Sequence, residues 1–482
     1  MFSQIKRLGT DTAIYGVSTV FGRLLNFLLV PFYTNVLMPS EYGTVSYAYS
    51  LIAFFNIVYA LGMESAFFKY ASSQELGDEK ENFSTPFTAI VLTSIFFSVL
   101  LSLNAQSIAG MIQIPVHGEF ILYCSAAMLA LDAVTNIPFA LLRRQRKAKR
   151  FAAIKVANIV INVGMNLYLL LGRQMGVKGI FISGVVASGA TVVMLLPTIV
   201  HNFRPRIHTK LLHELLRYGI PTIPAGVASI IVQVADRPIM MKLTDSATVG
   251  IYQANYKLGI FMMLIVSMFE YAWRPFFFSV AKEENAKQIF SRVLTYFVFV
   301  ALFVFLVLTF FIDDLVKLSI FGRHIIHPNF WSGLYIVPIV LLGYVFLGIA
   351  TNLSAGLYIE KRTSLTPIST FVAAVVNVAA NYFLIPLYGI AGAAWATLLA
   401  YFAMAITAYI TTHKVYPIRY EWGRVALLAV ISFVLTVLFY FVAMHSTIEK
   451  LFLLICFPLL LFVFKFFRTE EIEKVKQIFH RQ

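Results

Sequence analysis

Long apolar runs constrain the fold of this sequence more than any other feature. Fourteen stretches of about 20 residues are apolar enough to cross the roughly 30 Å hydrocarbon core of a bilayer as helices, and short connectors separate them. Because 59% of the residues are hydrophobic, a soluble fold is excluded. The sequence predicts an all-α polytopic membrane protein. The predicted spans are 12–37, 43–68, 84–106, 118–142, 151–171, 177–200, 218–241, 247–273, 293–312, 331–358, 364–385, 389–412, 423–444 and 448–467.

The distribution of Lys and Arg predicts the orientation of these spans. The N-terminal sequence has no compact apolar core ending in a cleavage site, so we expect the first helix to be retained. With a cytoplasmic N-terminus, most basic residues fall on inner loops and ends, such as "RRQRKAKR" at 143–150. This positive-inside pattern places both termini in the cytoplasm. It also explains the net charge of +15 by topology and lipid headgroups rather than by nucleic acid. The outer loops hold only Arg173, Lys178, Lys242, Lys317, Arg323 and Lys450.

An internal repeat is visible in two pairs of asparagines. The same 215 residues separate Asn162 from Asn377 and Asn166 from Asn381. Two glycines follow each pair, and the first copy is two residues longer before them. Residues four apart share a helix face, so each pair is placed to hydrogen-bond a neighbouring helix. Packing is favoured over substrate contact for these pairs. The two glycines after each pair also correspond, Gly176 and Gly179 to Gly389 and Gly392. Weaker echoes link Tyr15 with Tyr218 and Gly43 with Gly250.

The repeat predicts two six-helix lobes followed by two extra helices. Because six spans return the chain to the same side, the two copies enter the membrane from one side and are parallel repeats. The expected division is 1–202 for the N-terminal lobe, 203–415 for the C-terminal lobe, and 416–482 for the last two spans with a basic tail.

Charged residues inside predicted spans are costly in lipid and normally face a bundle interior or a wet cavity. Several lie on spans one, two, seven and eight, so we expect a cavity between the lobes to gather them. The basic residues are Arg23, Lys155, Arg237 and Lys257, with Arg274 at an inner end, and the acidic residues are Glu64, Asp132, Asp236 and Glu270.

Some of these charges have structural explanations. Glu270 and Arg274 are four apart, so mutual neutralisation is weighed equally with a functional role. Asp236 and Arg237 are adjacent and are expected to point about 100° apart rather than pair. For Lys155, snorkelling to the cytoplasmic interface is the favoured interpretation.

Two further cations have no acidic partner at a helical spacing. Arg23 therefore needs a distant partner or an anionic ligand, whereas the isolated Lys257 can also be explained by a polar helix face. Pro221, Pro224 and Pro238 interrupt span seven, as expected of a hinge.

Enzyme signatures are missing from the sequence. There is no P-loop or HExxH motif, and the two cysteines, Cys124 and Cys456, lie in predicted spans. The acidic pair at 313–314 is interpreted as a solvated helix end. We therefore expect neither a cofactor nor a metal.

The chain resembles polysaccharide flippases of the multidrug/oligosaccharidyl-lipid/polysaccharide exporter superfamily, in its O-antigen and capsule branch. The resemblance rests on "LMPSEYGTVSYAYS" (Leu37–Ser50), "DRPIMMKLTDSATVGIYQANYKLG" (Asp236–Gly259) and "NYFLIPLYGIAGAAWATLLAY" (Asn381–Tyr401). It implies two lobes around a central cavity, alternating access in the bacterial inner membrane, and a substrate of the undecaprenyl-pyrophosphate-oligosaccharide kind. It also implies a pyrophosphate-binding set of cations, here Arg23, Arg237, Lys257 and Arg274.

The resulting hypothesis is a secondary transporter, not an enzyme, that flips a lipid-linked oligosaccharide. Asp236, Glu64 and Glu270 are candidates for binding a coupling proton or sodium ion. Expected partners are the lipid-linked oligosaccharide, membrane lipids and polysaccharide polymerase machinery. Two alternatives stay open: a cation-coupled multidrug exporter of the same superfamily, and a membrane glycosyltransferase or polymerase.

Overall fold

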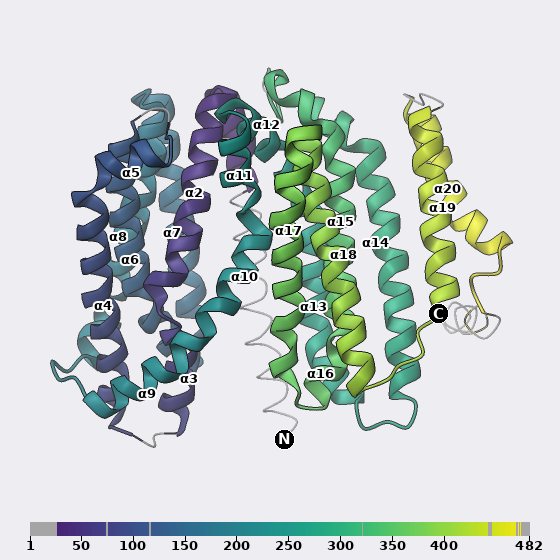
Figure 1. Cartoon of the computed structure of the whole chain (residues 1–482). Coiled ribbons are helices and arrows are strands. Elements are labelled where there is room, and N and C mark those ends of the chain that lie inside the picture. Colours follow the sequence, from purple (N-terminus) through teal and green to yellow (C-terminus); the bar gives the residue numbers. More distant parts are fainter. Residues whose placement is uncertain are drawn as a thin grey trace. The chain divides into compact units, whose positions relative to one another are not determined.

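The computed structural model describes residues 27–73, 76–114, 117–320, 322–441, 446–468, 471 and 473. This part of the chain is almost wholly helical (Figure 1). Helices satisfy their own backbone hydrogen bonds, which lipid cannot do, so long apolar sequences in a membrane fold this way. One small hairpin is present, in which β1 (Ser319–Ile320) pairs antiparallel with β2 (Arg323–His324).

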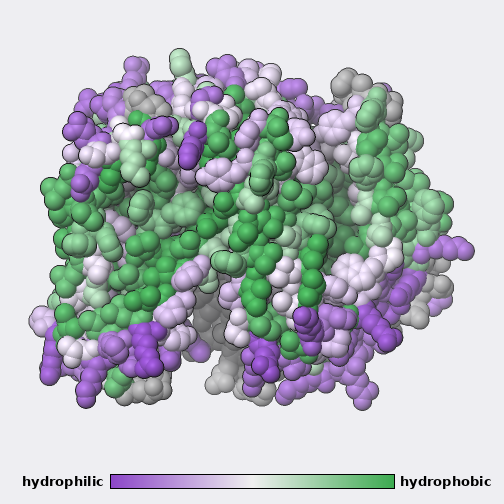
Figure 2. Space-filling view, in the orientation of Figure 1, coloured by the Kyte–Doolittle hydropathy of each residue, from purple (hydrophilic) through white to green (hydrophobic). Residues whose placement is uncertain are grey.

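The predicted spans are found in the structure. In the described residues, twelve helical segments are long and apolar enough to cross a membrane, and they match the second to thirteenth predicted spans. α20 (Thr447–Val463) matches the fourteenth. Most of the first span lies outside the described residues, which include a short apolar helix at Phe27–Val36. On the face shown in Figure 2, hydrophobic residues cover the middle of the helices and hydrophilic residues gather at their ends.

The chain divides into two compact units. The described part of the first unit runs to Ile260 and includes Ile326–Gly333 and Thr370–Ala400. In it, α6 packs against α4 and α8, α7 against α8, α10 and α12 against α2, and α9 against α3. Its helices are α2 (Pro39–Ala60), α3 (Met63–Ser73), α4 (Glu79–Leu103), α5 (Ala105–Met111), α6 (Gly118–Arg144), α7 (Ala148–Leu167), α8 (Gly176–Asn202), α9 (Thr209–Gly219), α10 (Ile223–Val234), α11 (Asp236–Leu243) and α12 (Ser246–Tyr256).

The second unit is built around α14, which packs against α15, α19 and α20. Phe299 of α14 stacks on Phe457 of α20, with ring centroids 5.9 Å apart. α17 and α18 contribute residues to both units, and the predicted division at 202 and 415 stays a prediction. The remaining helices are α13 (Ile260–Val280), α14 (Ala286–Lys317), a 3-10 segment (Pro328–Ile336), α15 (Val337–Leu353), α16 (Ala355–Ile359), α17 (Thr366–Tyr388), α18 (Ile390–Val415) and α19 (Trp422–Phe441).

The paired asparagines adopt the same geometry in both copies of the repeat. The Asn166 amide donates to the Asn162 carbonyl oxygen at 2.8 Å and to its side-chain oxygen at 3.1 Å. Asn381 makes the same two bonds to Asn377 at the same distances. The expected bond to a neighbouring helix is present in the first copy, where the Tyr33 hydroxyl donates to Asn166 at 3.1 Å. In the second pair, both of these bonds lie within α17.

The turns that follow the two asparagine pairs also correspond. Gly176 and Gly389 both have left-handed backbone, with φ of 54° and 56°, which glycine adopts without steric cost. The first copy has two more residues between its second asparagine and this glycine. A π-helical turn at Tyr168–Gly172 follows α7. The added length lies after it, because residues 173–175 separate Gly172 from Gly176, whereas Gly389 directly follows the end of α17 at Tyr388.

Glycines allow close approach between spans two, seven and eight. A Cβ atom on Gly43 of α2 would collide with the Ser246 carbonyl oxygen of α12, and one on Gly250 with the Pro39 carbonyl oxygen. Likewise, a Cβ atom on Gly62, between α2 and α3, would collide with the carbonyl oxygen of Gly219, the last residue of α9.

The predicted interruption of span seven is confirmed. A 3-10 turn at Ile220–Thr222 separates α9 from α10, and α10 ends before α11 begins at Asp236. Pro221 lies in this turn, and Pro224 and Pro238 lie in the first turns of the helices that follow. Proline lacks the N–H that a continuous helix would need, so the span is built from short segments.

Candidate functional site

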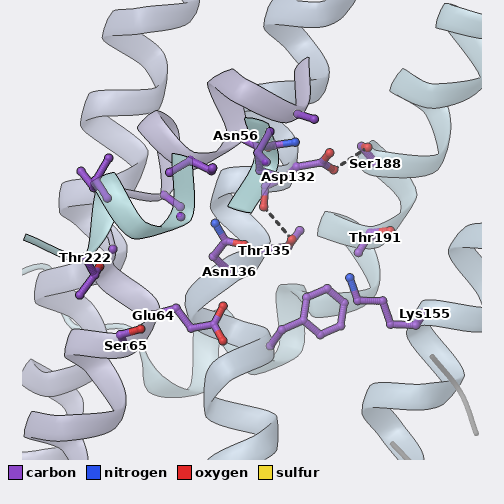
Figure 3. Close-up of a pocket in the computed structure, with 18 of the residues that line it drawn as sticks. Asn56, Glu64, Ser65, Asp132, Thr135, Asn136, Lys155, Ser188, Thr191 and Thr222 are labelled. Carbon is purple, nitrogen blue, oxygen red and sulfur yellow. Dashed lines mark hydrogen bonds between the residues drawn. The ribbon is translucent and has the colours of Figure 1, made fainter. Parts of the chain in front are cut away.

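A polar pocket of about 800 Å³ lies within the first unit, among α2, α3, α6, α7, α8 and α10 (Figure 3). Long stretches of these helices face lipid, so a concentration of polar side chains on their inner walls marks a wet space. We call this cavity the polar pocket. Its polar lining includes Asn56, Glu64, Asp132, Asn136, Lys155, Asn158, Ser188 and Thr191.

Glu64 enters the polar pocket from the first turn of α3. The helix is interrupted just before it, where Leu61 and Gly62 have φ of 50° and 64°. The Glu64 carboxylate forms an ion pair with Arg143, near the end of α6. This pair makes Glu64 an already neutralised carboxylate, and its role as a coupling-ion site stays a prediction.

Asp132 and its neighbours form a second polar wall. The Ser188 hydroxyl donates to Asp132 Oδ1 at 2.7 Å, which joins α6 to α8 (Figure 3). Asn158 of α7 donates to the Thr191 hydroxyl at 2.9 Å and to the Ala187 carbonyl at 3.0 Å. Three helices are therefore connected by hydrogen bonds at the back of the polar pocket, which fixes the positions of its polar groups.

Lys155 lies on the wall of the polar pocket, so snorkelling to the interface is the wrong interpretation for this residue. Its ammonium is 4.3 Å from the centroid of the Phe139 ring, and its side chain points inward from α7 (Figure 3). Lys155 is seven residues after the start of α7 at Ala148, which is about 10 Å along the helix at 1.5 Å per residue. Solvation inside the pocket and the face of the aromatic ring stabilise the charge there.

Asp236 and Arg237 pair with each other, which corrects the expectation that neighbours in sequence point apart. Arg237 Nη1 lies 2.7 Å from Asp236 Oδ1, and Arg237 Nε donates to Gln253 Oε1 at 2.9 Å. The long arginine side chain folds back over the start of α11, so the 100° between neighbouring Cβ atoms does not keep the charges apart. The Tyr252 hydroxyl donates to the other Asp236 oxygen, and both charged residues are buried.

The other predicted site residues are dispersed. Lys257 is half-buried in the first unit and has no ion-pair partner among the described residues. Arg274 and Glu270 belong to the second unit and pair at 2.6 Å, which is the first of the two alternatives that their helical spacing left open. Arg23 lies outside the described residues. Arg237, Lys257 and Arg274 do not line the polar pocket, so their gathering around one cavity stays a prediction.

The sequence signalled only part of the polar pocket. Glu64, Asp132 and Lys155 stood out as charges inside apolar spans, but no spacing showed that they share one cavity. Asn158 and Ser188 gave no signal, because small polar residues are common at helix contacts throughout membrane proteins.

The helical spans and the polar pocket within their bundle define a multi-pass membrane protein with a transporter fold. The model of the family described as "Polysaccharide biosynthesis protein" matches residues 34–325, more than half of the chain, and the chain belongs to this family. The family resemblance predicted from the sequence motifs is thus confirmed. Among individual relatives, the chain is 21% identical over 378 residues to Lsg locus putative protein 1 of Haemophilus influenzae, covering 74% of this chain and 90% of that protein.

Solved transporter structures share the fold. A lipid II flippase, MurJ, in an inward closed conformation is 14% identical with a TM-score of 0.75, covering 93% of this chain and 97% of that one. An inward-facing MATE multidrug transporter of the MOP superfamily is 13% identical with a TM-score of 0.66, covering 81% and 94%. These likenesses confirm the predicted fold class, the all-α two-lobe transporter fold. At such identities they concern the fold alone.

Proposed function

We propose that this protein flips a lipid-linked oligosaccharide, of the undecaprenyl-pyrophosphate type, from the inner to the outer leaflet of a bacterial cytoplasmic membrane. The observation that carries the proposal is a polar pocket of about 800 Å³ inside the helical bundle of a polysaccharide biosynthesis family member. The product would serve surface polysaccharide synthesis, and the polymerase machinery would be the next partner.

The physical problem of such a reaction supports this use of the pocket. A sugar hydroxyl that enters hydrocarbon without a hydrogen-bond partner costs on the order of 2–7 kcal/mol, so an oligosaccharide needs a wet passage. The amides and carboxylates of the polar pocket offer both donors and acceptors to hydroxyl groups. The polyprenyl tail has no such need and would stay in the lipid.

Alternating access is supported by the segmented spans of the first unit. Span seven is divided by a 3-10 turn at Ile220–Thr222, and glycine contacts join spans seven and eight to span two. A few element-terminal residues of this kind can absorb the backbone rotation of a hinge. We place the N-terminus in the cytoplasm because of the basic inner loops.

The pyrophosphate would be attracted by Arg23, Arg237, Lys257 and Arg274, among which Lys257 is the better candidate in the described part. Arg237 is already committed to Asp236, and Arg274 to Glu270. For the same reason, a proton or sodium ion coupled through Asp236, Glu64 or Glu270 would have to compete with an arginine.

The test is a deletion strain complemented with the wild-type gene. Without the protein, lipid-linked oligosaccharide should accumulate on the cytoplasmic face and surface polysaccharide should be lost, while drug susceptibility stays unchanged. Unchanged polysaccharide with increased drug sensitivity would instead support the multidrug exporter. Oligosaccharide synthesis by the purified protein from a sugar donor would support the glycosyltransferase.

A further inference from the structure

Asp132 and Lys155 carry opposite charges on the wall of one pocket but are not in salt-bridge contact. Both residues line the polar pocket, yet neither forms an ion pair in the described part of the chain. Asp132 uses Oδ1 to accept a bond from Ser188 at 2.7 Å, and the described residues provide no partner for Oδ2. The Lys155 ammonium faces the Phe139 ring at 4.3 Å and has no hydrogen-bond acceptor among the described residues.

Two side-chain amides near Asp132 also have no hydrogen-bond partner among the described residues. Asn136 is four residues after Asp132 and shares its helix face, and Asn56 lines the pocket from α2. The side chains of Asn56 and Asn136 make no hydrogen bond to any other described residue. Figure 3 shows both near Asp132, with Lys155 on a different helix. The pocket therefore presents one unpaired ammonium beside several unfilled donors and acceptors.

The ion pair at the edge of the pocket does not account for the lysine. Glu64 is compensated by Arg143 from α6, so Lys155 is not needed to balance it. Charges within membrane spans are rare and costly, and they mark ligand pathways. The arrangement fits a ligand that brings its own negative charge to Lys155 and its own hydroxyl groups to Asp132 and the amides.

We propose that the polar pocket is a binding site for a hydroxylated anion, with Lys155 receiving the acidic group and Asp132 accepting bonds from adjacent hydroxyls. The inference rests on the proposed function and refines it. The cargo would place either an acidic sugar or its sugar-phosphate end in this pocket. A neutral sugar would bring no negative charge to Lys155.

Binding of small probes to the full-length protein in detergent tests this assignment. The probes are glucuronate for the acidic sugar, glucose 1-phosphate for the phosphate end, and glucose as the neutral control. The wild type should bind at least one anionic probe about tenfold more tightly than glucose. Preference between glucuronate and glucose 1-phosphate identifies the source of the negative charge.

The variants show whether Lys155 is responsible. Lys155→Gln should weaken binding of the preferred anion about tenfold, Lys155→Arg should retain it within about threefold, and Asp132→Asn should weaken it less than Lys155→Gln. Lys178→Gln is the matched control, because Lys178 also lies over an aromatic ring, Phe120, at 5.7 Å but does not line the polar pocket. Thermal unfolding of each variant checks that the fold is retained.

Three results would overturn the inference: no anionic probe binds the wild type, glucose binds as tightly, or Lys155→Gln binds like the Lys178→Gln control. Export in cells separates this inference from the proposed function. If Lys155→Gln restores surface polysaccharide as well as the wild type does, the assignment of Lys155 is wrong while the flippase proposal stands. If deletion of the gene leaves the polysaccharide unchanged, the flippase proposal itself fails.

Discussion

Gly43 and Gly250 touch where α2 crosses α12, and a side chain on either glycine would collide with the backbone of the opposite helix. The two residues echo each other in the two copies of the repeat. Equivalent positions of the two copies therefore contact each other within the first unit. A larger residue at either position would disturb the contact.

Substitution of either glycine by alanine should weaken this contact. The obstructing atoms are backbone carbonyls of Ser246 and Pro39, which cannot rotate away as a side chain does. We expect Gly43→Ala and Gly250→Ala each to cost about 1–3 kcal/mol or more of stability, measured by thermal unfolding in detergent. Gly189→Ala is the control, because the space around Gly189 is open. Equal stability of all three variants would show that the helices separate at no cost.

Removal of Arg237 should destabilise the protein strongly. Arg237 and Asp236 are both buried and bonded to each other, so Arg237→Met leaves a carboxylate without compensation. Loss of one partner of a buried pair typically costs about 3–5 kcal/mol. The double variant Asp236→Asn/Arg237→Met should recover much of this stability. No recovery in chemical or thermal unfolding would mean that the pair contributes mainly through other contacts.

Lys257 should behave in the opposite way. It has no ion-pair partner in the described residues, so Lys257→Gln leaves no charge uncompensated. We expect thermal stability to be retained or slightly raised and polysaccharide export to fall. Arg237→Met, by contrast, should lose both stability and export. Full export by Lys257→Gln would remove Lys257 from the pyrophosphate-binding set.

The two asparagine pairs should differ in their contribution to stability. Tyr33 donates to Asn166, whereas the side-chain oxygen of Asn381 has no partner among the described residues. Tyr33→Phe should therefore cost about 1 kcal/mol in the wild type and close to nothing in an Asn166→Ala background. The double-mutant cycle is measured by thermal unfolding. An equal cost of Tyr33→Phe in both backgrounds would contradict the bond.

The ion pair between Glu471, which follows the last span, and Arg424 of α19 should stabilise the protein less at low pH. Burial alone would raise the pKa of Glu471, but hydrogen bonds from the Arg468 backbone, Tyr296 and Arg424, with the Arg424 charge, hold this pKa below its usual value. A carboxyl with a lowered pKa in the folded state stabilises above its unfolded pKa of about 4.3 and loses this contribution as pH falls through the folded value. Wild type should thus be more stable than Glu471→Gln at pH 7, and the difference should shrink below about pH 4. A difference that is constant with pH would refute this.

Much of the fold was predictable because lipid leaves few alternatives. The length of the apolar runs predicted the spans, and the repeated asparagines predicted which spans correspond. The structure shows this correspondence, because Asn166 and Asn381 make the same bond to the asparagine four residues before them. The partners of individual side chains were harder to predict from the sequence. The pairing of Asp236 with Arg237 depends on how a long side chain folds back, and periodicity carries no information about this.

The polar pocket was predictable only as a set of separate charges. Asp132 and Lys155 come from different helices, and their sharing of one cavity depends on how α6 and α7 pack beside α8. The snorkelling interpretation of Lys155 considered distance from the membrane surface alone. The direction in which the residue faces decided its environment, and that direction is set by tertiary packing.

The turn at residues 173–175, directly after the π-helical segment Tyr168–Gly172, has a consequence for how the two copies of the repeat can differ. Two residues added to a regular α-helix would rotate everything beyond them by about 200°. Because the two extra residues of the first copy lie in this turn, the residues nearer the start of α7, including Lys155 and Asn158, keep their orientation. This turn can therefore lengthen while the surface of α7 that lines the polar pocket keeps its direction.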